Sequence, residues 1–583
     1  MVSNELELDS KSKYNIIIFL VTSIFAIHHL IFLISFEINF PYSVDFSDEF
    51  TPVFNLLINN EFTLLITKGV HILFFPNLIS LPILYLSNFD VTILYYLQWV
   101  VTAISLWIFY LILKQTDKKL IWTLIPISAF LFNPLISSAY WAISNLPWLF
   151  AMLGIILVVY IFNKKNINLK NFSSGTFFGL FSSLSIVVGV VVWIAGLILI
   201  LKNYKQSKNH EKKWICLWLS SIILTGALFF ILTSGSRDPI HFELLLSPAG
   251  YTFITNFLVS SFRLKFQFLM ISIGSISLIL SLIFTYFLIK KDYFKNYLPW
   301  FIFLLVGISA AIITASGRVQ FLETHLGNEP YYIPISHLFQ IGLLVLSAKL
   351  FFEYKKYNDK KKILSIIFIL IIIFQMILLV PSYYSGWQRG EYYYDEKTRY
   401  VSCFSLNPAQ SCQELHPILY ENYFLLENEF LEMINHLIIN KQSIFNDHDF
   451  NKENDSNIVN FSKFQNHVAI FSENNKINSI NKISISDQTI YEIVDPLLFI
   501  NGGLIIDQDS TIEGLFMLID DKPILKINDY NTQTIKQNDN SSLISWSIYL
   551  MSGYIENGCH SVNIVGITET EKIYSSNDIS ICR

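Results

Sequence analysis

The sequence predicts an all-α polytopic membrane domain followed by a C-terminal β-sandwich, and three observations lead to this fold class. First, 53% of the 583 residues are hydrophobic and only 15% are charged, unlike a soluble globular protein. Second, apolar runs long enough to cross about 30 Å of hydrocarbon recur as far as residue 381. Third, hydrophobic residues alternate with a period of two after residue 465, as in half-buried β-strands.

The apolar runs predict about eleven transmembrane helices. The run from Thr176 to Leu201 is too long for one helix, and Gly189 in its middle predicts a split into two short spans. The first run has no small-residue cleavage site after it, so we interpret it as a retained helix with a cytoplasmic N-terminus. The nine other runs are residues 15–36, 91–113, 120–138, 146–163, 213–233, 266–289, 298–315, 332–352 and 363–381.

The basic residues decide the expected orientation. The apolar run Val70–Leu86 contains Pro76 and Pro82, and counting it as a span would reverse every later loop. If it is instead a surface or re-entrant segment, 21 lysines lie in inner loops and five basic residues in outer loops, as the positive-inside rule favours. We therefore expect a multi-pass protein of the cell (plasma) membrane whose C-terminal domain is extracytoplasmic. The five outer residues are Lys68, Arg237, Arg263, Lys265 and Arg318.

Composition divides the chain into four parts. Residues 1–383 form the polytopic domain, whose first outer loop covers 37–90. Residues 384–445 are predicted to be an extracytoplasmic helical region, because Leu415–Ile444 has helical periodicity. Residues 446–465, rich in Asn, Asp and Lys, are interpreted as a linker, and 466–583 as the β-sandwich, which would bind a glycan or partner or act as a spacer or lid. Its predicted strands include His467–Ser472, Lys482–Ile485, Gly503–Ile506, Ile512–Ile519, Ile544–Leu550 and Ser561–Ile567.

Four cysteines follow the last predicted span, on the side where disulfides form. Local pairing would join Cys403 to Cys412 and Cys559 to Cys582, although four cysteines allow three connectivities. A bridge between Cys559 and Cys582 would close a loop of 24 residues and would stabilise the domain by about 3 kcal/mol in the loop-entropy model.

The first outer loop contains the strongest candidate for chemistry. Asp45, Asp48 and Glu49 have the spacing i, i+3 and i+4, so on a helix the three carboxylates would share one face. Clustered carboxylates raise one another's pKa, and they can hold a divalent cation such as Mg²⁺ or Mn²⁺ or leave one member as a general base. The alternative is a solvated acidic loop.

The order of these features resembles the GT-C type glycosyltransferases, membrane enzymes that use polyprenyl-phosphate-linked sugars. The acidic motif follows the first span, and Lys68–Leu78, with His71 and the Phe75-Pro76 pair, is similar to the surface-helix segment before the second span in that superfamily. The chain is more closely similar to an uncharacterised bacterial and archaeal branch, but lacks the acidic and arginine members of that branch's usual His/Glu/Arg cluster. Weaker similarity extends to Ser183–Gly189 and Gly317-Arg318, over roughly residues 15–445.

The resemblance implies a sugar transfer at the outer face of the membrane, to a surface glycan, glycolipid or protein. A first-loop carboxylate, Asp48, Glu49 or Asp45, would deprotonate the acceptor, and an arginine would stabilise the departing lipid phosphate. Arg318 is the favoured ligand for this phosphate, with Arg237 and Arg263 as further candidates. Asp238 could simply neutralise Arg237, and Arg263 with Lys265 could extend to lipid headgroups.

The remaining residues leave several alternatives open. His71 and Lys68 would line the acceptor cleft or be ordinary interfacial residues, and His28 with His29 indicate a polar face turned toward the bundle.

The net charge of −5 offers no basic surface for nucleic acid, and motifs for nucleotide hydrolysis, zinc and serine hydrolases are absent from the sequence. A transporter or flippase for lipid-linked glycans, and a non-catalytic scaffold that presents the β-sandwich, remain the competing functions.

Overall fold

A computed structural model describes most of the membrane region and the strands after it. The described residues are 2–36, 53, 55–61, 64, 67–68, 71–137, 142–164, 167–206, 212–233, 242–264, 266–290, 294–319, 327–355, 362–406, 436, 458–459, 469–472, 482–485, 488–492, 497–507, 512–519, 522–527, 530–534, 541–551, 559–568, 573–575 and 579–582. Contacts divide the chain into two compact units, Met1–Tyr394 and Asp395–Arg583.

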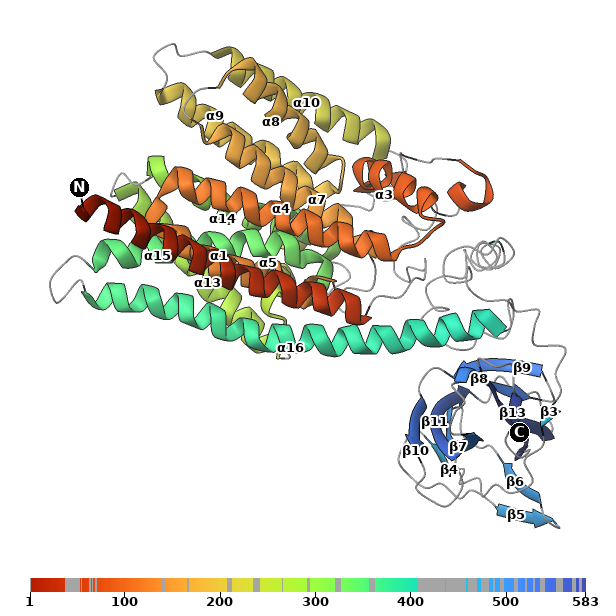
Figure 1. Cartoon of the computed structure of the whole chain (residues 1–583). Helices are drawn as coiled ribbons and strands as arrows, with labels where there is room; N and C mark the ends of the chain where they lie inside the picture. The colour runs from red at the N-terminus through yellow and green to blue at the C-terminus, as the bar shows by residue number, and fades with distance from the viewer. Residues whose placement is uncertain are drawn as a thin grey trace. The chain divides into compact units, whose positions relative to one another are not determined.

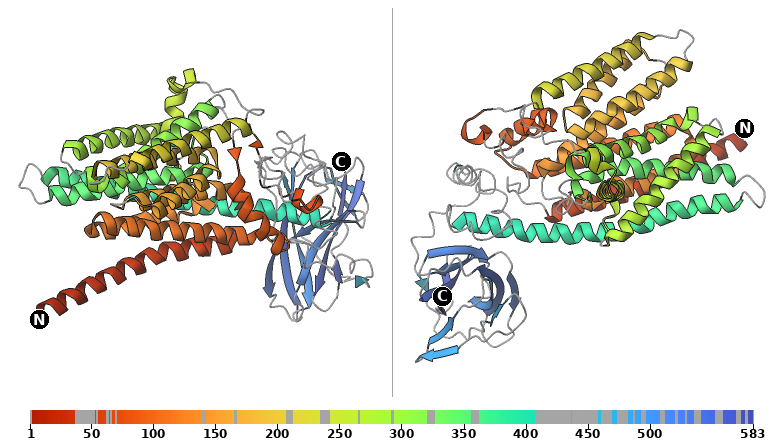
Figure 2. Two further views of the ribbon diagram at one scale, coloured as in Figure 1. Left: turned by 90° about the horizontal axis from the view of Figure 1, so that it is seen from above. Right: turned by 180° about the vertical axis from the view of Figure 1, so that it is seen from behind.

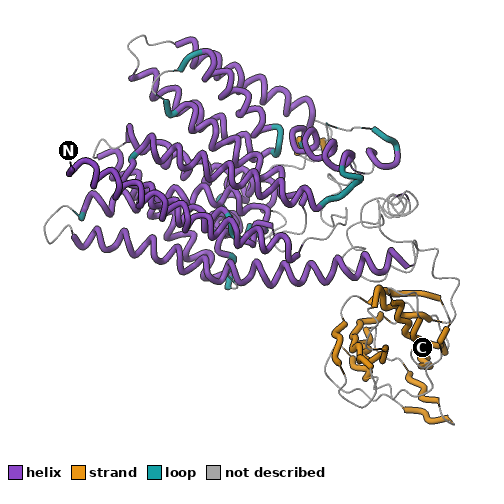
Figure 3. The backbone as a smooth tube through the Cα atoms, viewed as in Figure 1, coloured by secondary structure: helices purple, strands orange, loops and turns teal. Residues whose placement is uncertain are grey.

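The first unit is a bundle of long helices (Figures 1 and 3). Among the described residues, ten helical segments are long and apolar enough to cross a bilayer, which identifies a multi-pass membrane protein. The elements that form them are α1 (Val2–Phe36), α4 (Thr92–Thr116), η1 (Lys118–Thr123) with α5 (Leu124–Leu131) and α6 (Pro134–Ser137), α7 (Ala142–Phe162), η2 (Val187–Val191) with α9 (Val192–Gln206), α10 (Lys212–Thr233), α13 (Gln267–Lys290), α14 (Phe294–Arg318), α15 (Ile333–Tyr354) and α16 (Lys362–Leu406).

The expected eleventh span is a shorter helix, α8 (Leu169–Ser183). The run from Thr176 to Leu201 does divide into two helices, but the break lies at residues 184–186 and not at Gly189. With 15 residues, α8 is only about 22 Å long, less than the thickness of the hydrocarbon layer. Gly189 has another role, because a Cβ there would lie 2.0 Å from the Ser182 carbonyl oxygen.

The run with two prolines forms α3 (Phe74–Leu86), whose 13 residues reach only about 20 Å and do not span a bilayer. A hairpin of β1 (Thr67–Lys68) and β2 (His71–Ile72) precedes it. The Phe75 amide donates to the Leu184 carbonyl at 3.3 Å, so α3 begins beside the break that follows α8.

The surface of the bundle is apolar where helices face outward. Ile223 and Leu224 of α10 are each 70% exposed, as expected for side chains that contact lipid tails. In contrast, α15 lies inside the bundle and nearly all of its residues are buried. A helix that is apolar on all sides and surrounded by other helices forms the centre of such a core.

Short elements connect these helices at the ends of the bundle. They are α11 (Phe242–Leu245), α12 (Pro248–Leu258), η3 (Ser260–Phe262) and η5 (Pro330–Tyr332). Figure 2 shows the same bundle from above and from behind.

The second unit contains strands, and those predicted from alternation are present in the structure. One sheet has the order β10-β11-β7-β4, and the other joins β3-β13-β12-β14-β6-β5, with β8 paired to β12 and β9 paired to β8. Their packing as a β-sandwich stays a prediction. The strands are β3 (Ile458–Val459), β4 (Ala469–Ser472), β5 (Lys482–Ile485), β6 (Gln488–Glu492), β7 (Leu497–Asp507), β8 (Ile512–Ile519), β9 (Lys522–Ile527), β10 (Tyr530–Thr534), β11 (Ser541–Met551), β12 (Cys559–Thr568), β13 (Ile573–Ser575) and β14 (Ile579–Cys582).

The region after the last span begins as a continuation of that span, since α16 extends to Leu406 and includes Cys403. Most of the predicted helical region up to residue 445, Cys412 and nearly all of the linker lie outside the described residues. In the sheet, antiparallel β12 and β14 place Cys559 directly opposite Cys582. This register is compatible with the predicted local pairing.

Candidate functional site

One end of the bundle is rich in lysine, and polar contacts show which helix ends meet there. Asp117, after α4, accepts a hydrogen bond from Tyr297 of α14 at 2.7 Å and pairs with Lys349 of α15 at 3.8 Å. Lys202 of α9 donates to Asn163, which follows α7, at 3.1 Å, and Asn163 donates to Gln115 of α4 at 3.2 Å. The C-terminal ends of α4, α7, α9 and α15 and the beginning of α14 therefore lie together. We call this the lysine end, and it includes Lys114, Lys118, Lys164, Lys202, Lys205, Lys349 and Lys355.

The opposite end, which we call the arginine end, is where α14 finishes at Arg318 and where Arg263 follows η3. Here η5 packs against α7, α15 and η3. These contacts bring the residues before α15 next to the beginning of α7, although they are far apart in sequence.

Tyr332 of η5 is the centre of the arginine end. Its side chain is 1% exposed. Its ring centroid lies 5.3 Å from that of Trp148, 4.9 Å from that of Phe257 and 4.5 Å from that of Tyr331. Such edge-on and tilted ring pairs are favourable geometries, so the aromatic packing holds the segment before α15 in place.

Two charged residues also act on this phenol. Burial raises the pKa of Tyr332 well above its ordinary value of 10.0; Tyr331 and Glu329 raise it further, and Arg318 acts in the opposite direction. Arg318 and Glu329 therefore both lie close enough to act on the same phenol. Tyr331 is only partly buried.

Arg263 reaches the same end in an unusual backbone conformation. It is the C-cap of η3 with φ 37° and ψ 62°, in the left-handed region that side chains other than glycine rarely adopt. Its side chain is partly buried, and η3 packs against η5. The structure thus brings Arg263 and Arg318, two of the three predicted phosphate ligands, to one end of the bundle.

Lys68 and His71 are also brought together. They are opposite each other in the antiparallel pair of β1 and β2, immediately before α3. Because α3 begins beside the break after α8, at the end of the bundle opposite the lysines, the hairpin belongs to the arginine end (Figure 1).

The first-loop carboxylates Asp45, Asp48 and Glu49 lie outside the described residues, as does Arg237. The structure nevertheless locates the chain on both sides of the carboxylates. α1 ends at Phe36, whose ring centroid lies 5.3 Å from that of Trp387, and Val53 is 3% exposed. Trp99, near the start of α4, donates to the Ala26 carbonyl at 3.0 Å, so α1 leaves the bundle at the arginine end.

Comparison with known proteins returned no match. No protein-family model fits the chain, and no curated protein or solved structure is significantly similar to it. Among the described residues, no cluster of three or more His, Cys, Asp or Glu side chains could hold a metal ion.

The sequence did not predict a series of buried hydrogen bonds that connects α16 with residues after α5 and in η3. Asn133 donates to Ser382 at 2.7 Å, Ser382 donates to the Ser261 carbonyl at 2.7 Å, and the Ser261 and Ser336 hydroxyls are 2.8 Å apart. A Cβ at Gly386 would lie 2.6 Å from the Leu135 amide, so this glycine permits the close approach of α16. The only signal in the sequence is the presence of polar residues within apolar runs.

The two histidines of α1 face the bundle, as predicted. His28 accepts a hydrogen bond from Trp387 at 3.1 Å, and His29 is 1% exposed with its ring against Phe132. These contacts attach α1 to α16 and α5.

Proposed function

We propose that the protein is a membrane glycosyltransferase that moves a sugar from a polyprenyl-phosphate donor to a surface glycan, glycolipid or protein. The observation that carries this proposal is the gathering of Arg318, Arg263, Glu329 and the Tyr331–Tyr332 pair at the arginine end. The chain also enters its acidic loop from this end. A cationic group beside a carboxylate-bearing loop is what an acid–base displacement of a phosphate requires.

The orientation follows from the two ends of the bundle. The positive-inside rule assigns the lysine end to the cytoplasm, which makes the arginine end extracytoplasmic. The structure describes the chain up to Phe36 and again at Val53, and Asp48 follows Phe36 by 12 residues. An extended chain of that length reaches at most about 40 Å. Both the carboxylates and the arginines would then act at the outer surface.

The reaction that suits these groups is an inverting displacement. A first-loop carboxylate, with Asp48 as the first choice, accepts the proton of the acceptor hydroxyl while the acceptor oxygen forms a bond to the anomeric carbon. The bond between that carbon and the phosphate oxygen breaks, and its electron pair leaves with the lipid phosphate. Arg318 stabilises this anion through its permanent charge and its paired N–H donors.

Glu329 and Tyr332 serve to position Arg318. Tyr332 is buried among aromatic rings and is close enough to Arg318 for the arginine to act on its pKa. Apolar surroundings of this kind strengthen the interaction of an arginine with a phosphate. The hairpin that contains Lys68 and His71 offers further polar groups for the acceptor. The strands after residue 457 would form an extracytoplasmic β-sandwich that binds a glycan or covers the site. A divalent cation at the first-loop carboxylates stays a prediction.

The experiment compares cells that produce the wild type, Asp48→Asn, Arg318→Gln or the control Lys355→Gln, an exposed residue at the lysine end. Surface glycans are profiled by mass spectrometry, and the membrane abundance of each protein is measured. We expect one glycan to disappear in the first two variants at unchanged abundance, and the control to match the wild type.

The leaflet in which the lipid-linked sugar accumulates separates the enzyme from a transporter. Loss of a transferase would leave the donor in the outer leaflet, whereas loss of a flippase would retain it in the inner leaflet. An unchanged glycan profile in both Asp48→Asn and Arg318→Gln would refute the proposal and favour a scaffold.

A further inference from the structure

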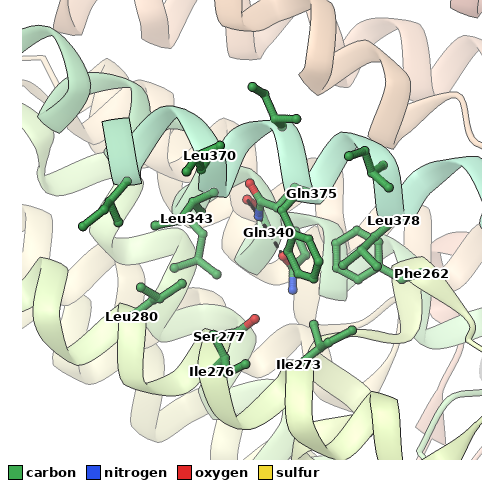
Figure 4. A pocket seen from close by; sticks show the side chains of 15 residues that line it. Phe262, Ile273, Ile276, Ser277, Leu280, Gln340, Leu343, Leu370, Gln375 and Leu378 are labelled. Atoms are coloured by element: carbon green, nitrogen blue, oxygen red, sulfur yellow. Dashed lines mark hydrogen bonds between the residues drawn. The ribbon is translucent and has the colours of Figure 1, made fainter. Parts of the chain in front are cut away.

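A cavity of about 460 Å³ lies between α13, α15 and α16, with Phe262 of η3 in its wall (Figure 4). Its volume is in the range of small-molecule sites. Its walls are apolar, with residues such as Ile273, Leu343 and Phe374, and none of the 15 lining residues is charged. Because all three helices are long and apolar enough to cross a bilayer, the ligands available to this cavity are lipids.

Two glutamines and Ser277 form the polar part of the wall. Gln340 and Gln375 are 1% and 4% exposed, and both lie near the middle of their apolar spans. Gln340 Nε2 donates to the Leu258 carbonyl at 2.8 Å, and Gln375 Nε2 donates to Gln340 Oε1 at 2.9 Å. The Leu258 carbonyl can only accept, so it determines the orientation of both amides.

The last oxygen atom in this series of hydrogen bonds, Gln375 Oε1, has no partner among the described residues. Gln375 Oε1 is buried and has no hydrogen-bond partner within the described structure. An unpaired buried carbonyl is costly, and more so in a membrane, where water does not satisfy it. The wall of the cavity therefore contains an unpaired acceptor, Gln375 Oε1, in addition to the Ser277 hydroxyl, and only a ligand that brings a donor can satisfy this acceptor.

The same features exclude most membrane lipids. A phosphate or other charged headgroup would lie in an apolar cavity without a counter-ion, which is expensive at this depth. Esters and ketones carry only acceptors, which cannot satisfy Gln375 Oε1. A long hydrocarbon with a single hydroxyl meets both conditions, because one hydroxyl is the smallest polar group that can donate.

We propose that this cavity binds an uncharged long-chain lipid alcohol, whose hydroxyl donates to Gln375 Oε1 while its hydrocarbon chain occupies the space between α13, α15 and α16. None of the lining residues is assigned a role in the proposed sugar transfer, so this proposal does not depend on that function.

The test uses the full-length protein in detergent and tritiated farnesol as the probe. Unlabelled farnesol and farnesyl methyl ether compete for the site, because the ether has the same chain but no donor. We expect farnesol to compete about fivefold better than the ether, the magnitude of one hydrogen bond. In Gln375→Leu this preference should disappear. Because the preference is a ratio measured on the same sample, partial loss of folded protein does not change it.

Two further variants test the location. Ile276 lines the cavity, and Ile276→Trp should fill part of it and weaken both competitors. The control Ile223→Trp adds the same side chain at an outward-facing position of α10 that is 70% exposed, and it should leave binding unchanged.

Equal competition by farnesol and its ether would refute the assignment and indicate a cavity that takes any apolar chain. Absence of saturable farnesol binding, or stronger competition by farnesyl phosphate, would overturn it as well.

Discussion

Removal of the Ser382 hydroxyl tests whether the hydrogen-bond chain holds α16 to the rest of the bundle. Ser382 is 0% exposed and takes part in two hydrogen bonds of 2.7 Å, one from Asn133 Nδ2 and one to the Ser261 carbonyl. In Ser382→Ala, the Asn133 donor and the Ser261 carbonyl lose these bonds, at a position that bulk water does not reach.

The expected loss of stability follows from these two bonds. Hydrogen bonds between helices in a membrane contribute on average about 0.6 kcal/mol each, and a buried polar group that is left unpaired costs about 1–3 kcal/mol. We therefore expect Ser382→Ala to lower the free energy of unfolding by about 1–3 kcal/mol. The measurement is reversible unfolding of the purified protein in mixed micelles, followed by circular dichroism.

The control is Ser23→Ala in α1. The Ser23 hydroxyl bonds only to the Phe19 carbonyl of its own helix, at 2.9 Å and in an exposed position, so its removal should cost less than about 0.5 kcal/mol. A double-mutant cycle with Asn133→Ala isolates the coupling between Asn133 and Ser382. Equal effects of Ser382→Ala and Ser23→Ala, or a coupling energy of zero, would contradict the argument.

Two further predictions concern the arginine end and the strands. The pKa of Tyr332 is raised in the folded protein, so its contribution to stability is complete below pH 10 and is lost as the pH rises further. In thermal unfolding, Tyr332→Phe should therefore lose less stability than the wild type between about pH 10 and 12. Equal losses in the two proteins would count against the buried phenol. Cys559 and Cys582 lie opposite each other in β12 and β14, so protein from an oxidising compartment should give a peptide pair linked by a disulfide in non-reduced mass mapping, whereas two free thiols would exclude the bridge.

Local pattern was sufficient to predict most of the secondary structure. Apolar runs predicted the ten helical segments that are long enough to cross a bilayer, because a helix in lipid has to be apolar over about 20 residues wherever it lies in the bundle. Alternation predicted strands such as Lys482–Ile485 and Ile512–Ile519 in the same way. The prediction was less accurate at α8, since hydropathy does not record that the helix stops at Ser183, and Gly189 was given the wrong role.

The sequence also sorted the basic residues into two groups, but only the structure showed which residues meet at each end. Asp117 contacts Tyr297 and Lys349 at the lysine end, across separations in sequence that no local pattern reports. At the arginine end, Glu329, Tyr331 and Tyr332 follow Arg318 closely in the chain. The approach of Trp148 was not expected, since it depends on how α7 packs against η5.

By itself, the sequence determined that this is a multi-pass membrane protein, because a helix that crosses lipid has to be long and apolar, and local composition shows this directly. Tertiary structure decided which polar atoms find partners. Gln340 and Gln375 are 35 residues apart, and Asn133 and Ser382 are 249 residues apart. A hydrogen bond needs both of its partners, so only the packed bundle shows that Asn133 is paired with Ser382 and that Gln375, in the wall of a cavity, has an Oε1 without a partner in the described structure.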